Sequence, residues 1–271
     1  MRTEELLTKD IPEILDYVSL DPEINLFITG DIGSFGIDGR HVRVKGFRQE
    51  NGALAGVLLR YMDRNYIFYS RHGTVPSELI ASVVRMDNPS LKGVCVSGKS
   101  SLINSVAPFL PELHEEVTMM ARCNEVKALP PSSSAEVRLL SEVDFDDYLS
   151  LIDNIAEFAS FRHEESYEEQ KDSWLASKKR GSATYGVYEK GLLVAIASST
   201  ADTAESAMLV GVCTREGYRC RGYASMAVNA LLRDRFAKGE KFLCLFYDNP
   251  LAGAIYHRFG FVDIASYSML H

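Results

Sequence analysis

The sequence has no long apolar run, no paired metal-ligand motif and no excess of positive charge. Its longest apolar stretches, such as residues 192–197, are far too short to span a bilayer, and the acidic segment 1–15 lacks the apolar core of a secretory signal. Five cysteines form no C-x-x-C pair and six histidines form no i,i+4 pair, which argues against a disulfide framework and a structural zinc site. We therefore expect a cytoplasmic protein with no metal and no membrane partner.

The net charge and the length of the chain exclude further classes of protein. A net charge of -8 over 271 residues disfavours an electrostatic nucleic-acid binder, although a local basic loop can still hold a phosphorylated ligand. With 46% apolar and 24% charged residues, the composition is that of a soluble globular protein and excludes wholesale disorder. The length is sufficient for two domains, each with its own hydrophobic core.

One stretch, residues 124–135, has the composition of a linker. It holds two consecutive prolines followed by three serines, and no apolar periodicity. We therefore predict a domain over residues 1–126, a linker over 127–135 and a second domain over 136–271.

The two halves follow a common plan of hairpin, strand, helix, strand, helix and strand. In the first half the hairpin surrounds Asn51-Gly52, and the predicted elements are strands 41–49, 53–61 and 66–69, a helix through 79–84, strand 93–96, a helix near 102–109 and strand 116–122. In the second half the elements are strands 183–188, 192–198 and 207–213, helix 222–236, strand 241–247, helix 249–258 and strand 261–270. The pattern predicts an α+β (mixed α/β) fold present in two copies.

The most informative segment, residues 212–225, joins an apolar strand to an amphipathic helix. Arg219, Gly222 and Ala224 form an R-x-x-G-x-A pattern at the helix start. Unpaired backbone N–H groups and the helix dipole favour an anion there, and glycine lets its backbone approach closely. Arg219 and Arg221 add positive charge, so the segment predicts a pyrophosphate cradle. A solvated basic turn is the alternative.

A second pattern follows the strand at 241–247. Asn249 suits a helix cap, Pro250 the first helical turn and Gly260 the helix exit. Tyr256 lies seven residues after Asn249, which is two helical turns, so the two side chains can share a face. A core aromatic is the alternative interpretation of Tyr256.

Together the two patterns resemble those of the GNAT superfamily of N-acetyltransferases. The acyl-CoA loop [Q/R]-x-x-G-x-[G/A] is matched from Arg219 to Ala224, and N-x-x-A-x-x-x-Y-x-x-x-G-F is matched by Asn249, Ala252, Tyr256, Gly260 and Phe261. The resemblance covers residues 136–271. The first half resembles a diverged copy whose segment 70–76 lacks the loop. Two GNAT-like domains are thus implied, each a mostly antiparallel mixed sheet flanked by helices.

The resemblance also implies roles for individual residues. The main chain of Val212, Cys213 and Thr214 would pair with the pantetheine arm, and Asn249 would contact the pantetheine or a water beside it. Tyr256 would protonate the leaving thiolate. Acetyl-CoA would be the cosubstrate, attacked directly by an amine acceptor. A homodimer is a further assembly that the resemblance allows. The pyrophosphate would be held by the N–H groups of the loop residues Arg219, Cys220, Arg221, Gly222, Tyr223 and Ala224.

The general base is not identified by the sequence. Asp202, Glu205, Glu164 and Glu165 are candidates, each with a solvated surface charge as the alternative. The segment 157–165, with its phenylalanines and Arg162, is expected to line the acceptor pocket.

Two other functions compete with an acyltransferase. A non-catalytic acyl-CoA sensor or scaffold would use the same cradle. Residues 93–100 also satisfy G-x-x-x-x-G-K-[ST], the phosphate loop of NTPases. However, the strand expected at 94–96 lies inside that loop, where the backbone would have to curl around phosphates, so we expect no nucleotide site there.

Overall fold

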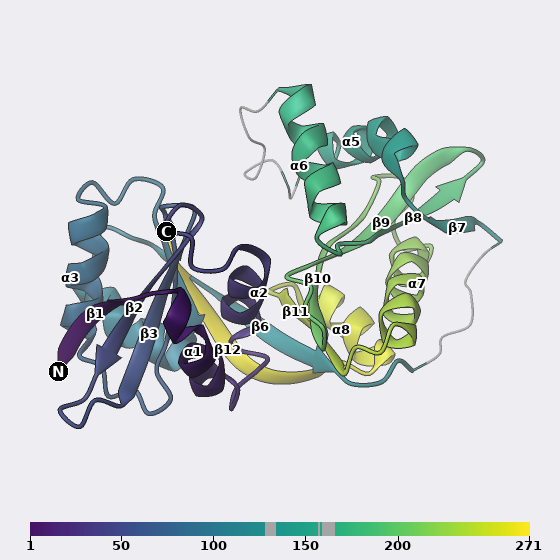
Figure 1. The fold of residues 1–271 in the computed structure, drawn as a ribbon. Helices are drawn as coiled ribbons and strands as arrows, with labels where there is room; N and C mark the ends of the chain where they lie inside the picture. Colours follow the sequence, from purple (N-terminus) through teal and green to yellow (C-terminus); the bar gives the residue numbers. More distant parts are fainter. Residues whose placement is uncertain (128–133, 157, 159–165) are drawn as a thin grey trace. The chain divides into compact units, whose positions relative to one another are not determined.

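The computed structural model describes residues 1–127, 134–156, 158 and 166–271, which fall into two compact units (Figure 1). The first unit is Met1–Met120 together with Asp263–His271, and the second is Ala121–Val262. The division thus differs from the predicted 1–126 and 136–271, because the final strand belongs to the first unit. Most of the predicted linker lies outside the described residues. No helix of the described part has the length and apolar character needed to cross a membrane.

The sheet of the first unit is antiparallel apart from one pair of strands. Its order is β1-β2-β3-β4-β5-β12, with β6 beside β12. Only β4 and β5 run parallel among the pairings described for these strands. The strands are β1 (Arg2–Leu6), β2 (Val42–Arg48), β3 (Leu54–Tyr61), β4 (Asn65–Tyr69), β5 (Cys95–Lys99), β6 (Glu115–Cys123) and β12 (Val262–Leu270).

Four α-helices accompany this sheet in the described residues: α1 (Ile11–Val18), α2 (Leu26–Phe35), α3 (Ser77–Asp87) and α4 (Ser100–Val106). Helix α3 forms the crossover that the parallel pair β4–β5 requires. Helix α2 was not predicted, because Gly30, Gly33 and its β-branched residues have low helix propensity. Burial of Leu26, Ile28 and Ile32 stabilises it instead.

The second unit repeats this plan. Its sheet has the order β11-β10-β9-β8-β7, and β10 and β11 are parallel with α7 as the crossover. The strands are β7 (Glu136–Leu139), β8 (Thr184–Glu189), β9 (Leu192–Thr200), β10 (Ser206–Thr214) and β11 (Phe242–Tyr247). The prediction of an α+β fold with two similar halves is confirmed.

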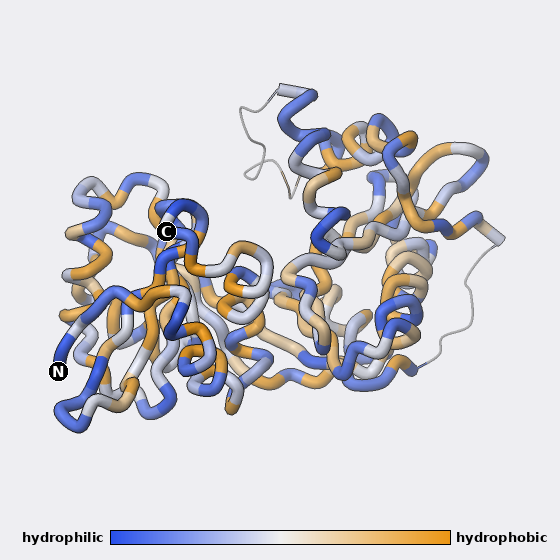
Figure 2. Tube along the Cα trace, in the orientation of Figure 1, coloured by the Kyte–Doolittle hydropathy of each residue, from blue (hydrophilic) through white to orange (hydrophobic). Residues whose placement is uncertain are grey.

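Helices lie on both faces of the second sheet. Buried residues of α7 (Tyr223–Ala237) and α8 (Pro250–Phe259) pack in one apolar cluster with the sheet, and those of α5 (Phe145–Asp153) and α6 (Tyr167–Lys179) in another. Helix α6 is largely hydrophilic (Figure 2) and is anchored by Trp174, which is its buried residue. Between β8 and β9, Lys190 and Gly191 both have positive φ, as a two-residue hairpin loop with the twist of the strands requires.

The segment that resembles an NTPase phosphate loop is a strand. Cys95–Lys99 forms β5, and Ser100 begins α4 without an intervening loop. A Cβ on Gly98 would lie 2.6 Å from the carbonyl oxygen of Phe68, so this glycine serves close packing between strands. The extended backbone cannot wrap a phosphate, in agreement with the expectation that no nucleotide site exists here.

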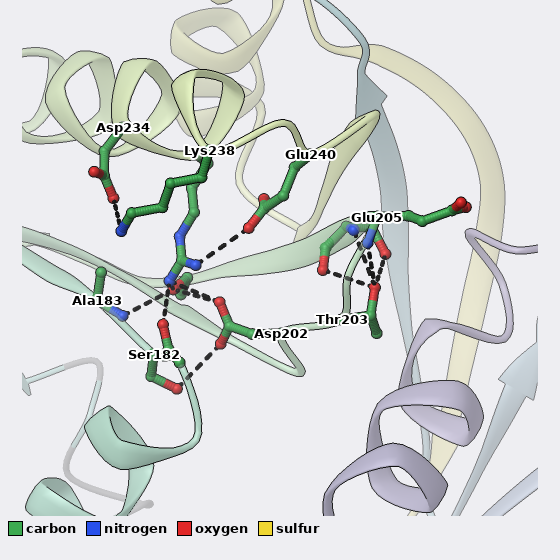
Figure 3. A network of polar contacts seen from close by, with 12 residues as sticks. Ser182, Ala183, Asp202, Thr203, Glu205, Asp234, Lys238 and Glu240 are labelled. Carbon is green, nitrogen blue, oxygen red and sulfur yellow. Dashed lines mark hydrogen bonds and ion pairs between the residues drawn. The ribbon is translucent and has the colours of Figure 1, made fainter.

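A buried ionic network ties the end of α7 to the neighbouring loops (Figure 3). Arg235, 4% exposed, forms ion pairs with Asp202 at 2.7 Å and with Glu240 at 3.2 Å. It also donates to the carbonyl oxygen of Gly181 at 2.8 Å and to the Ser199 hydroxyl. The three charged groups are all nearly inaccessible to water, so each depends on the others for compensation.

Candidate functional site

Strand β10 leaves its neighbour β11 partway along its length. The parallel pairing ends at Leu209 and Leu245, while pairing with β9 continues to Thr214. Between Val210 and Cys213 of β10 the register with β9 shifts at a bulge, where Gly211 has a φ of +59°. Among the described pairings, none joins β10 to β11 beyond the bulge, and an extended ligand would add its hydrogen bonds along this edge.

The loop after β10 turns sharply into α7. Gly222 is the N-cap of this 15-residue helix and has a φ of 82°, a left-handed conformation that glycine adopts without strain. Cys220 also has a positive φ, of 63°. Around the loop, Arg219 Nε donates to the Thr214 carbonyl oxygen at 3.3 Å, and the Arg221 guanidinium lies 5.4 Å from the centre of the Tyr218 ring. The N–H groups and the positive end of the α7 dipole thus lie in the same loop region as two arginines, and both favour a bound anion.

Helix α8 begins and ends as its sequence predicts. Asn249 Oδ1 accepts from the Leu251 N–H at 2.9 Å, Pro250 is the first residue, and Gly260 ends the helix with a φ of 103°. Because the Asn249 oxygen serves the cap, its Nδ2 is the atom that remains for a ligand contact.

Tyr256 lies on the inner face of α8 and is 8% exposed. Its ring centre is 6.1 Å from that of Tyr247 and 6.0 Å from that of Phe261. A Cβ on Gly253 would come within 2.4 Å of the Tyr247 ring, so only glycine lets this aromatic group pack on the helix. Burial raises the pKa of Tyr256 to about 12, and the phenol therefore keeps its proton at neutral pH.

These segments surround one cavity of about 380 Å³, a size usual for small-molecule pockets. Arg221, whose guanidinium is turned onto Tyr218, is absent from the described wall. The other residues predicted to bind the cosubstrate, together with Tyr256, lie on it: Val212, Cys213, Thr214, Arg219, Cys220, Gly222, Tyr223, Ala224, Asn249 and Tyr256.

Comparison with a known family identifies the domain that contains this pocket. The model of the family described as "Acetyltransferase (GNAT) family" matches residues 148–261. Residues 148–261 form a GNAT acetyltransferase domain. This range contains the strand, loop and helix that surround the pocket. No curated protein matches the chain.

Solved structures extend the likeness of fold beyond the GNAT domain. A GCN5-related N-acetyltransferase from Sphaerobacter thermophilus is 13% identical with a TM-score of 0.70, over 99% of this chain and 94% of that one. A Drosophila protein is 14% identical with a TM-score of 0.72, over 99% and 97% of the two chains. A tandem GNAT protein from the clavulanic acid biosynthesis pathway is 12% identical with a TM-score of 0.61, over 99% and 98%. At these identities the likeness concerns the fold.

Sequence reasoning did not find every residue of the pocket in the GNAT domain. Phe158 belongs to the segment expected to line an acceptor site and does lie on the wall, while Phe161 and Arg162 lie outside the described residues. Ile155, three residues before Phe158, was not predicted; the i,i+3 spacing of two apolar residues is the signal that could have indicated both. The other lining residues not assigned beforehand are Tyr218, Ser225, Asp248, Leu251, Ala252 and Ile255.

The proposed general bases are not brought to the pocket. Asp202 is held by Arg235, and Glu205 is exposed and paired with Lys241. Neither belongs to the wall, so both have structural partners instead of an acceptor to deprotonate. Glu164 and Glu165 lie outside the described residues. Among the described lining residues, Asp248 is the one carboxylate.

Proposed function

We propose that this chain is an acyl-CoA-dependent N-acyltransferase that transfers acetyl from acetyl-CoA to an amine. The observation that carries the proposal is a cavity whose wall combines β10 beyond its bulge, the N-terminus of α7 and the buried Tyr256. We further propose that it acts in the cytoplasm, where its five cysteines would stay reduced.

In this proposal the GNAT domain holds the cosubstrate through three kinds of contact. The pyrophosphate lies against the N–H groups of residues 219–224, where the dipole of α7 and Arg219 favour negative charge. The amides of the pantetheine arm pair with β10 after the bulge at Gly211, and Nδ2 of Asn249 donates to the same arm. Fixing the thioester in this way supplies much of the rate enhancement through orientation.

The proposed reaction is a direct transfer within a ternary complex. The lone pair of a neutral amine forms a bond to the thioester carbonyl carbon, and the carbonyl electron pair moves to oxygen. When that pair returns, the carbon–sulfur bond breaks and the thiolate leaves with its electrons, while the amine nitrogen gives its proton to water. Tyr256 then donates its proton to sulfur and regains a proton from water. Because its pKa of about 12 exceeds that of an ordinary thiol, its larger contribution is a hydrogen bond to the negative charge as it develops.

A direct test combines binding with turnover. Isothermal titration should show that acetyl-CoA binds the purified protein, and free thiol should be released when a library of amines is added with it. Binding without thiol release from any amine would favour a sensor or scaffold. The absence of both would contradict the proposal.

Gly222→Ala is expected to weaken CoA binding by about tenfold or more. The added methyl group obstructs the close approach of the pyrophosphate and disfavours the left-handed backbone by roughly 1–2 kcal/mol. Gly217→Ala is the matched control, since Gly217 has a φ of 80° in the same loop with open space around its Cα. Titration calorimetry on both variants separates the two effects; equal losses of affinity would show that backbone strain alone is responsible.

Cys220 is expected to be alkylated first among the five thiols and to be protected by CoA. It is exposed and lies on the pocket wall, while Cys123, Cys213 and Cys244 are buried and burial raises the pKa of Cys95 to about 11. Mass spectrometry after brief treatment with iodoacetamide checks this prediction. Labelling of Cys220 at the same rate with and without CoA would contradict the proposed position of the cosubstrate.

A further inference from the structure

An arginine outside the pocket wall reaches the start of α7 from the neighbouring helix. Arg258 is exposed in the last turn of α8, and its Nη2 lies 3.5 Å from the Ser225 hydroxyl oxygen. Ser225 is the third residue of α7 and lines the pocket. The Arg258 guanidinium therefore lies at the rim of the pocket, beside the same helical turn whose first N–H groups point toward the proposed pyrophosphate.

This contact contributes little to the stability of the fold. A hydrogen bond of 3.5 Å between exposed groups is at the limit of length, and it leaves most of the five guanidinium donors to solvent or to a ligand. The two arginines of the loop are engaged differently, because Arg219 donates to the Thr214 carbonyl oxygen and Arg221 lies over the Tyr218 ring. Arg258 thus adds a cation on the side of the pocket that faces α8.

The chemistry of CoA offers a partner for this cation. Besides the pyrophosphate, CoA carries a phosphate monoester on its ribose, and a molecule of this size extends beyond a cavity of about 380 Å³. The loop amides suit the pyrophosphate, so the nucleotide end would continue over the rim. A monoester carries close to two negative charges at neutral pH, and a planar guanidinium can bind it through two parallel hydrogen bonds.

We propose that Arg258 is a specificity-determining residue that binds the ribose 3′-phosphate and makes the protein prefer CoA to 3′-dephospho-CoA. The proposal rests on the proposed function, since it assumes that CoA occupies the pocket.

The test compares two ligands on four proteins by titration calorimetry. The wild-type protein should bind CoA about tenfold more tightly than 3′-dephospho-CoA, and Arg258→Gln should reduce that preference to below about twofold by weakening CoA alone. Arg258→Lys should restore part of the preference. Arg233→Gln, which removes an exposed arginine of α7 that is not on the described pocket wall, should leave the preference unchanged. Added salt should lower the wild-type preference and have little effect on that of Arg258→Gln.

The outcomes separate this inference from the proposed function. If Arg258→Gln weakens both ligands equally, or if its preference for CoA stays at the wild-type value, the inference is wrong and the acyltransferase proposal stands. If the wild-type protein binds neither ligand, the proposed function itself fails. Thermal unfolding of each variant, expected to match the wild type because Arg258 is exposed, shows that the comparison concerns folded protein.

Discussion

Replacing Tyr256 with phenylalanine is expected to lower kcat by about a hundredfold while the Kd for CoA changes less than about twofold. A positioned proton donor contributes roughly 10²–10⁴ to a rate, and the ring of Tyr256 is retained in the variant. Since Tyr256 is 8% exposed and packs against Tyr247 and Phe261, phenylalanine should fill the same space. Steady-state kinetics by thiol release, with calorimetry for binding, checks both parts of the prediction.

Tyr247→Phe is the matched control for this experiment. Tyr247 lies beside Tyr256, but its hydroxyl is 3.3 Å from Nε2 of His257 and exposed. Loss of that hydroxyl should leave kcat within about twofold of the wild type. An unchanged rate in Tyr256→Phe would remove Tyr256 as the proton donor. Equal losses in the two variants would point to packing of the rings and not to donation.

Replacing Arg235 with methionine is expected to reduce the free energy of unfolding by about 3–5 kcal/mol. The arginine is 4% exposed, and its removal leaves the carboxylates of Asp202 and Glu240 buried without their compensating charge. Methionine keeps much of the side-chain volume, so the loss reports on charge more than on a cavity. Urea unfolding followed by circular dichroism measures the change.

Lys238→Met is the control for the buried network. Lys238, the C-cap of α7, pairs with Asp234 at 2.7 Å on the surface, and exposed pairs of this kind contribute less than about 1 kcal/mol. A loss in Arg235→Met no greater than in Lys238→Met would contradict the structural role assigned to the network. Because Arg235 is outside the described pocket wall, folded Arg235→Met protein should bind CoA as the wild type does.

The parts of the site that the sequence predicted are those with local causes. Gly222 and Gly260 adopt positive φ at helix ends, and Asn249 and Pro250 begin a helix, so each of these residues shapes its own turn of backbone. The hairpin of β8 and β9 likewise is indicated by Gly191, which adopts its positive φ without strain. Such signals act within a few residues and can be recognised in a single sequence.

The parts that were missed depend on packing between distant segments. Helix α2 forms because its apolar residues are buried, against the low propensity of two glycines. Ile155 reaches the pocket wall because it packs with residues of α6 and β9 in the same apolar cluster. Asp202 could not be assigned to an ion pair, because its partner Arg235 is 33 positions later in the chain and nothing in the local pattern connects them.

The membership of Asp263–His271 in the first unit constrains how the chain folds during synthesis. Met120 leaves the ribosome roughly 140 residues before the strand that completes its unit. At translation rates of roughly 5–20 residues per second this delay is about 7–28 s. During that time β5 has no β12 beside it, so its edge is open to wrong partners. We expect the first unit to reach its native state only after the second has been synthesised, so the two units cannot mature in the order in which they are encoded.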